Sequence, residues 1–72
     1  QRNAQYPAAA RVYQRVLELH PRRAVWWMGL GLALEGEGSQ TQAAQAYRRA
    51  LAAGGLAADL DNYVRERLRV LQ

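Results

Sequence analysis

The residue types that could support catalysis or metal binding are few and lie far apart in the chain. The only histidine, His20, directly precedes Pro21, and no nucleophile is spaced beside it as a general base requires. Ser39 is better explained as a helix cap, and Asp59 and Asp61 as charges near a helix N-terminus. There is no cysteine, and one histidine with scattered carboxylates does not form a metal-ligand cluster. We therefore expect no enzymatic activity, no bound metal and no cofactor.

The adjacent tryptophans Trp26 and Trp27 could form a stacking platform for a sugar or a nucleobase. Trp27 begins an apolar stripe at helical spacing, so we expect its ring in the core. Trp26 lies one step around the same helix, and we expect it to pack on the preceding helix. An exposed binding role for Trp26 is the alternative.

Arginine supplies all ten basic residues, and the net charge is +4. Helical repeat proteins can bind RNA, so a nucleic-acid surface has to be considered. Carboxylates interleave with the arginines, however, and we expect a solvated face instead. The arginine pairs are Arg11 and Arg15, Arg48 and Arg49, and Arg65 and Arg69, and the interleaved acids are Glu18, Asp59 and Glu66.

Apolar residues recur at helical spacing in four segments of the chain. The expected helices span residues 6–19, 24–35, 40–52 and 58–71. No segment alternates with period two over a useful length, so the predicted class is all-α. No apolar run approaches the roughly 20 residues that a membrane-spanning helix needs.

Helix-breaking residues separate these segments. Pro21 ends the first helix, the Gly36–Gly38 segment the second, and the Gly54–Gly55 pair the third. Ser39 followed by Gln42 predicts a capping box at the start of the third helix, in which each side chain accepts from a free backbone amide.

The chain also repeats itself at a fixed interval. Tyr13 and Tyr47 are separated by the same number of positions as Ala9 and Ala43. The interval equals the period of about 34 residues that is typical of stacked helical hairpins. Residues 24–57 resemble one full unit of the tetratricopeptide repeat (TPR) family, with a leucine where that family usually has a tyrosine. The matching residues are Trp27, Leu30, Gly31, Leu34, Ala43, Tyr47 and Ala50, and Ala9 and Tyr13 match the preceding unit.

Close packing of two antiparallel helices explains this pattern. Gly31 and Ala43 would let the helix axes approach, while the rings of Trp27 and Tyr47 fill the space around them.

The resemblance implies one unit over residues 1–72, a TPR-like α-solenoid fragment of four helices. Residues 5–21 match the second helix of a partial repeat, and residues 24–57 form the full repeat. Asp61 and Arg65 fall where the family has tryptophan and glycine, so residues 58–72 are expected to be a capping helix. We expect the fragment to come from the C-terminal end of a longer array.

In TPR proteins the first helix of each unit lines a concave groove. By resemblance this groove contains Val25, Met28, Leu32 and Glu35, and the matching positions on the capping helix are Asn62, Glu66 and Arg69. The apolar side chains among them suit an amphipathic helix or an apolar peptide. The lysine and asparagine residues with which some TPR proteins hold a peptide C-terminus are absent from the first four positions.

The expected function is a protein–protein interaction scaffold that binds a peptide or helix of a partner protein. The ending of the chain, residues 47–72, is similar to TPR proteins of bacterial pilus biogenesis, particularly the mannose-sensitive haemagglutinin pilus, and of secretion machinery. A composition rich in Arg, Ala, Leu and Gly also suggests a bacterial source. The resemblance to pilus and secretion proteins implies a location in the cell envelope. The alternatives are an Arg-rich repeat that binds nucleic acid, or a homodimer formed through the uncovered face of Tyr6, Ala9, Tyr13 and Val16.

Overall fold

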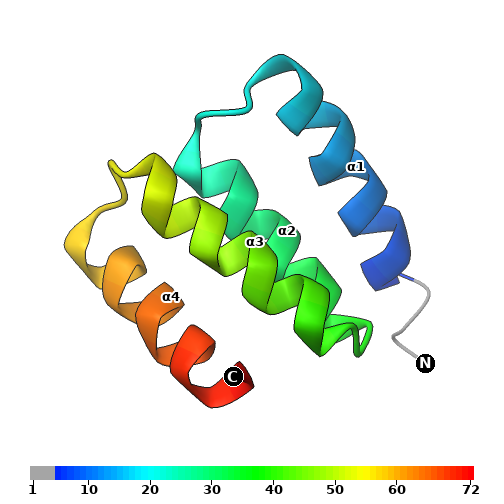
Figure 1. The fold of residues 1–72 in the computed structure, drawn as a ribbon. Helices are drawn as coiled ribbons and strands as arrows, with labels where there is room; N and C mark the ends of the chain where they lie inside the picture. The colour runs from blue at the N-terminus through cyan, green and yellow to red at the C-terminus, as the bar shows by residue number, and fades with distance from the viewer. Residues whose placement is uncertain (1–4) are drawn as a thin grey trace.

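The structure, a computed structural model, describes residues 5–72, with side-chain surroundings from residue 7 onward. Four helices follow one another: α1 Gln5–Leu19, α2 Ala24–Gly36, α3 Gln40–Ala53 and α4 Ala58–Leu71 (Figure 1). These described residues contain no strand. The predicted all-α class is confirmed, and each helix end lies within one residue of the boundary expected from the sequence.

Glycines in the last two connections let the chain reverse direction. Gly38 has a φ of +91°, and Gly54 and Gly55 have φ values of +76° and +89°. Side chains disfavour this left-handed region, whereas glycine enters it without steric cost. The connection after α1 has no such residue and turns at Pro21, with the His20 N–H still donating to the Val16 carbonyl at 2.9 Å.

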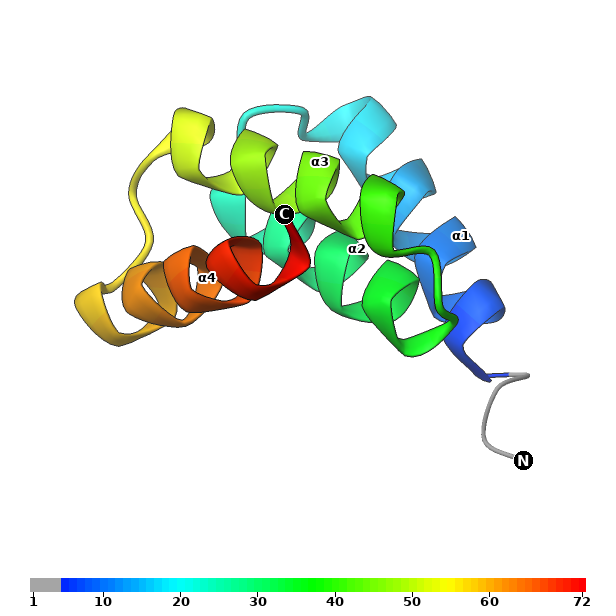
Figure 2. The same cartoon turned by 60° about the horizontal axis from the view of Figure 1, so that its bottom comes forward.

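Each helix packs against the next one in the chain, so α2 lies between α1 and α3 while α3 lies between α2 and α4 (Figures 1 and 2). The molecule therefore has two broad faces. We call the one rimmed by α1 and α3 the α1–α3 face, and the opposite one, rimmed by α2 and α4, the α2–α4 face.

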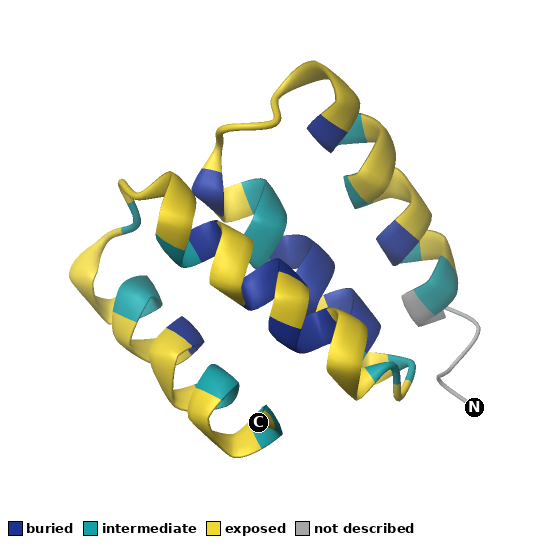
Figure 3. Cartoon of the chain, viewed as in Figure 1, coloured by how far each residue is buried: buried dark blue, intermediate teal, exposed yellow. Residues whose placement is uncertain are grey.

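The core is centred on the contact between α2 and α3 (Figure 3). Small alanines on α3 bring the two helices close, and larger side chains on α2 fill the remaining space. The dominant buried ring is Tyr47, which has no exposed surface. The buried residues of this cluster are Ala10, Leu17, Leu30, Ala33, Leu34, Ala43, Ala46, Tyr47, Ala50 and Val64.

A tyrosine ring from a neighbouring helix packs directly on each of two glycines of α2. A Cβ atom added at Gly31 would lie 2.7 Å from the Tyr47 ring, so that ring occupies the space a side chain would need. Gly29 stands in the same relation to Tyr13 on α1, and the sequence pattern did not single out this second contact. Both α1 and α3 therefore contact α2 through a tyrosine ring that packs against the glycine backbone.

The predicted capping box at Ser39 is wrong. Ser39 does precede α3, but its hydroxyl donates to the Glu37 carboxylate at 3.0 Å and makes no bond to an α3 amide. Its ψ of 71° departs from the extended conformation in which a capping side chain reaches the helix amides. Gln42 is exposed. The charged carboxylate of Glu37, two residues before Ser39, accepts the Ser39 hydroxyl in place of a backbone contact.

The two glycine contacts predict unequal responses to alanine. Both substitutions gain about 1 kcal/mol of helix propensity, but Gly31→Ala presses on a fully buried ring and should incur an overpacking cost of about 1–3 kcal/mol. Gly29→Ala presses on the half-buried Tyr13 ring, which can move toward solvent. Urea unfolding should therefore find Gly31→Ala the less stable variant. Equal stability of the two would contradict the assigned role of the Tyr47 ring.

Candidate protein-interaction surface

The outer side of α2 carries the four residues that the sequence assigns to a binding groove. Val25 and Leu32 are 37% and 39% exposed. Met28 lies between them in the sequence and packs partly against the core, while Glu35 is half-buried. Two exposed aliphatic side chains on one side of a helix, with an adaptable methionine, offer an apolar contact surface.

A hollow of about 490 Å³ lies between α2 and α4 on the same face. Leu32 and Gly36 line it from α2, and Tyr63, which is 43% exposed, lines it from α4. Glu35 and Arg67 complete the lining. The hollow thus combines an apolar wall with one charged pair.

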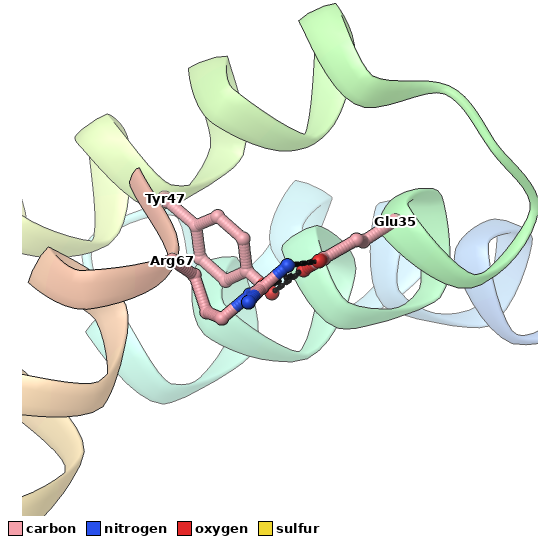
Figure 4. Close-up of polar contacts among 3 residues, drawn as sticks. All are labelled: Glu35, Tyr47 and Arg67. Carbon is pink, nitrogen blue, oxygen red and sulfur yellow. Dashed lines mark hydrogen bonds and ion pairs between the residues drawn. The ribbon is translucent and has the colours of Figure 1, made fainter. Parts of the chain in front are cut away.

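Glu35 joins three helices through this pair and a buried hydroxyl (Figure 4). The Tyr47 hydroxyl on α3 donates to Glu35 Oε1 at 2.9 Å. The Arg67 guanidinium on α4 donates to the same oxygen through Nε at 3.3 Å and forms an ion pair with Oε2 through Nη2. Glu35, which was predicted as a groove residue, also lines this hollow, and its carboxylate ties α3 and α4 to α2.

The electrostatics of this network follow from burial and charge. Burial raises the pKa of the Tyr47 hydroxyl, and its hydrogen bond to the Glu35 carboxylate raises that pKa further. The hydrogen bond to Glu35 also raises the pKa of the Arg67 guanidinium. The pairing of Arg67 with Glu35 was missed at the sequence level. A tyrosine buried in a core signals that an acceptor must receive its hydroxyl proton, and that signal points to Glu35.

The three expected groove residues of α4 lie outside the hollow. Asn62, Glu66 and Arg69 are not among its lining residues, and the Arg69 guanidinium pairs with the Glu66 carboxylate within the helix. Tyr63 and Arg67, each one position away from Asn62 and Glu66, face α2 instead. The α4 residues that line this hollow are therefore each one position from a predicted groove residue, and the role of Asn62, Glu66 and Arg69 stays a prediction.

A second hollow, of about 360 Å³, lies at the other end of the same face. Val25, Leu56 and Leu60 give it apolar walls, and Arg22 and Arg23 also line it. The exposed apolar surface of the α2–α4 face thus extends from Val25 at one end of α2 to Leu32 near the other.

Comparison with known proteins assigns this architecture. The family model described as tetratricopeptide repeat matches residues 1–58, which is most of the chain. The chain belongs to the TPR family. No curated protein and no solved structure is significantly similar to it. TPR repeats mediate protein–protein interactions and typically serve as non-catalytic scaffolds.

Within this TPR chain the two tryptophans have different surroundings. Trp26 is half-buried, and its ring centroid lies 6.3 Å from that of Tyr13 on α1. Trp27 packs against the core but is also half-buried, because one side of it lines a cleft between α1 and α3. Its indole N–H donates to the Pro21 carbonyl at 2.8 Å.

Within the part of the TPR chain whose side chains are described, four arginines pair with carboxylates: Arg15 with Glu18, Arg65 with Asp61, Arg67 with Glu35, and Arg69 with Glu66. Among the described residues, no three of His, Asp and Glu come close enough to hold a metal ion. No helix within residues 5–72 is long and apolar enough to cross a membrane.

The outer face of α1 is less covered than its counterpart on α3. Val12 is 59% exposed, whereas Ala46, the equivalent position of the next repeat, is 3% exposed because α2 covers it. Ala9, Tyr13 and Val16 are also less buried than their equivalents, although the Tyr13 ring packs on Gly29 of α2. The equivalent Ala43, Tyr47 and Ala50 have no exposed surface. Tyr6, expected on the same face, lies outside the residues whose side chains are described.

The raised pKa of Tyr47 predicts a loss of stability in alkali. Below about pH 10 the hydroxyl is protonated in both folded and unfolded chains. Above it, the unfolded chain releases the Tyr47 proton while the folded chain retains it, so the free energy of unfolding falls as the pH rises. Urea unfolding at about pH 8 and about pH 11 should show a larger loss for the native sequence than for Tyr47→Phe. Identical losses would contradict the buried network.

Proposed function

We propose that this TPR chain binds a peptide or helix of a partner protein on its α2–α4 face. The observation that carries the proposal is the exposure of Leu32 and Val25 on that face, with Tyr63 opposite Leu32 across a hollow. An amphipathic helix that inserted apolar side chains at helical spacing would bury these groups. The proposed contact residues are Val25, Met28, Leu32 and Tyr63, together with the exposed Asn62, Glu66 and Arg69 of α4.

The geometry of the hollow supports binding with little rearrangement. The Glu35 carboxylate fixes α4 relative to α2 through Arg67, and the same carboxylate is anchored by the buried Tyr47 hydroxyl. A surface held in place before binding loses less conformational entropy when the partner arrives. Glu35 therefore acts here as a positioning residue, and its contact with a partner would be secondary.

Protein is favoured over nucleic acid as the partner. Arginines that pair with carboxylates, such as Arg65 with Asp61 and Arg69 with Glu66, do not form the continuous positive surface that phosphate backbones require. The central groups of the α2–α4 face are apolar, so its binding should respond weakly to salt.

A place in a bacterial envelope assembly, such as pilus biogenesis or secretion, forms part of the same proposal. Its support is the similarity of residues 47–72, with their double glycine and final helix, to the ends of TPR proteins in those systems. The partner would then be another envelope protein.

Selection from a library of genomic fragments of the source organism, displayed as peptides, tests both parts of this proposal. Peptides that bind the native chain should lose affinity for Leu32→Glu by about tenfold or more, because a charge would be buried in an apolar contact. Val12→Glu places the same charge on exposed α1 and should leave binding unchanged. Affinity should vary little between low and moderate salt.

The proposal fails if Leu32→Glu and Val12→Glu behave alike, or if affinity falls steeply with salt. If the selected peptides derive from cytosolic proteins, only the proposed role in an envelope assembly is contradicted. Binding on the α2–α4 face is tested separately, by the Leu32→Glu variant.

Self-association through α1 is a second candidate function. It is favoured by the 59% exposure of Val12 at a position whose counterpart, Ala46, is covered by a helix. Light scattering at high concentration should then give the mass of a dimer for the native chain and of a monomer for Val12→Glu. A monomeric native chain would rule this candidate out.

A further inference from the structure

A cleft of about 490 Å³ lies on the α1–α3 face, on the side of the molecule opposite Leu32 and Val25. Side chains of α1 and α3 form its walls, and side chains of α2 form its floor. Its lining combines apolar groups on the floor with amides and guanidinium groups on the walls. The lining residues are Gln14, Trp27, Leu30, Leu34, Gln42, Gln45, Ala46, Arg48 and Arg49.

The floor of the cleft is apolar and held in place. Leu30 and Leu34 belong to the buried core and have only their outer edges in the cleft. The Trp27 ring is fixed at one end by its hydrogen bond to the Pro21 carbonyl. The Arg49 guanidinium lies 4.6 Å from the centre of this ring, a distance typical of a cation–π contact.

The walls carry positive charge and no carboxylate. Arg48 donates to the side-chain oxygen of Gln72 at 3.0 Å, and Arg49 has only the Trp27 ring as a partner within the described residues. Both charges are therefore left without an opposing ion. The three glutamine side chains in the lining can donate to and accept from a peptide backbone.

Comparison of the two repeats shows how this charge arises. Arg15, which is equivalent to Arg49 in the preceding repeat, is paired with Glu18 within α1. The position equivalent to Glu18 on α3 is occupied by Ala52. Arg49 thus lacks the neighbouring acid that its counterpart has, and its charge remains available to a ligand.

We propose that this cleft is a second binding site, which takes an acidic peptide segment. An aliphatic side chain of that segment would rest on Leu30 and Leu34 beside Trp27, while flanking carboxylates pair with Arg48 and Arg49. Charge complementarity selects this ligand, since an apolar floor beside two uncompensated guanidinium groups matches an aliphatic residue between acids. The site is separate from the α2–α4 face and does not depend on the function proposed for it.

A single-stranded nucleic acid fits the cleft less well. Strands bind proteins by stacking successive bases on exposed aromatic rings. The cleft has one such ring, its indole N–H is already bonded, and Arg49 covers part of it. The apolar floor formed by the two leucines offers nothing to a phosphate.

An NMR titration of the ¹⁵N-labelled chain provides the test. The probe is a blocked five-residue peptide with leucine at the centre and two glutamates on each side. The indole N–H signal of Trp27 should shift on addition of the peptide, while that of Trp26, which packs on Tyr13, should stay in place. The matching peptide with lysines in place of the glutamates should produce no shift.

Variants with equal loss of charge locate the site. Arg48→Gln and Arg49→Gln should each weaken binding about fivefold, the scale of a partly exposed ion pair. Arg22→Gln removes the same charge beside the hollow at Val25 and should leave the affinity unchanged.

Several outcomes would overturn the proposal. They are the absence of a Trp27 shift at millimolar peptide, an equal effect of Arg22→Gln and Arg49→Gln, and equal binding of the lysine peptide. Tighter binding of an oligothymidine, with displacement of the acidic peptide, would assign the cleft to nucleic acid instead.

Discussion

The close approach of the Tyr47 ring to the backbone of Gly31 sets the geometry on which the other contacts depend. A residue with a Cβ atom at position 31 would collide with this ring, so the spacing of α2 and α3 requires glycine at that position. The ring is fully buried, and its hydroxyl must then find an acceptor inside the protein. Glu35, one turn further along α2, supplies that acceptor and uses its second oxygen to hold Arg67 of α4. The packing of Tyr47 on Gly31 is thus linked, through the hydrogen bond to Glu35, to the position of α4.

Much of the fold could be predicted from the sequence because its signals are local. Pro21 and the glycines at 38, 54 and 55 mark the helix ends, and the repeat interval between Tyr13 and Tyr47 relates two of the helices. The contacts that could not be predicted join residues that are far apart in the sequence but close in space. Arg67 is remote from Glu35 along the chain, so their pairing follows only from how α4 packs. Ser39 failed as a cap because its backbone angle, which no pattern records, turns its hydroxyl toward Glu37.

The candidate surfaces were partly visible in the same way. The resemblance to TPR proteins predicted that Val25, Met28 and Leu32 line a groove, and Val25 and Leu32 are partly exposed in the structure. Tyr63, which the sequence analysis did not assign to the groove, lines the hollow opposite Leu32. The cleft beside Trp27 could not be predicted, because its width depends on how far apart α1 and α3 lie across α2. The two broad faces differ in chemistry: the one that contains Leu32 is apolar at its centre, and the one that contains Arg49 has positive walls.

The helices are fastened to one another unequally. α2 is packed on both sides, by Tyr13 of α1 at Gly29 and by Tyr47 of α3 at Gly31. α4, in contrast, contributes one fully buried residue, Val64. Local opening within a small domain begins where the least apolar surface is buried. α4 is therefore held by less buried apolar surface than its neighbours and depends on the Glu35–Arg67 pair, and its detachment would remove the hollow beside Leu32. A partner seated there would slow this detachment, so that binding and the retention of the final helix are thermodynamically linked.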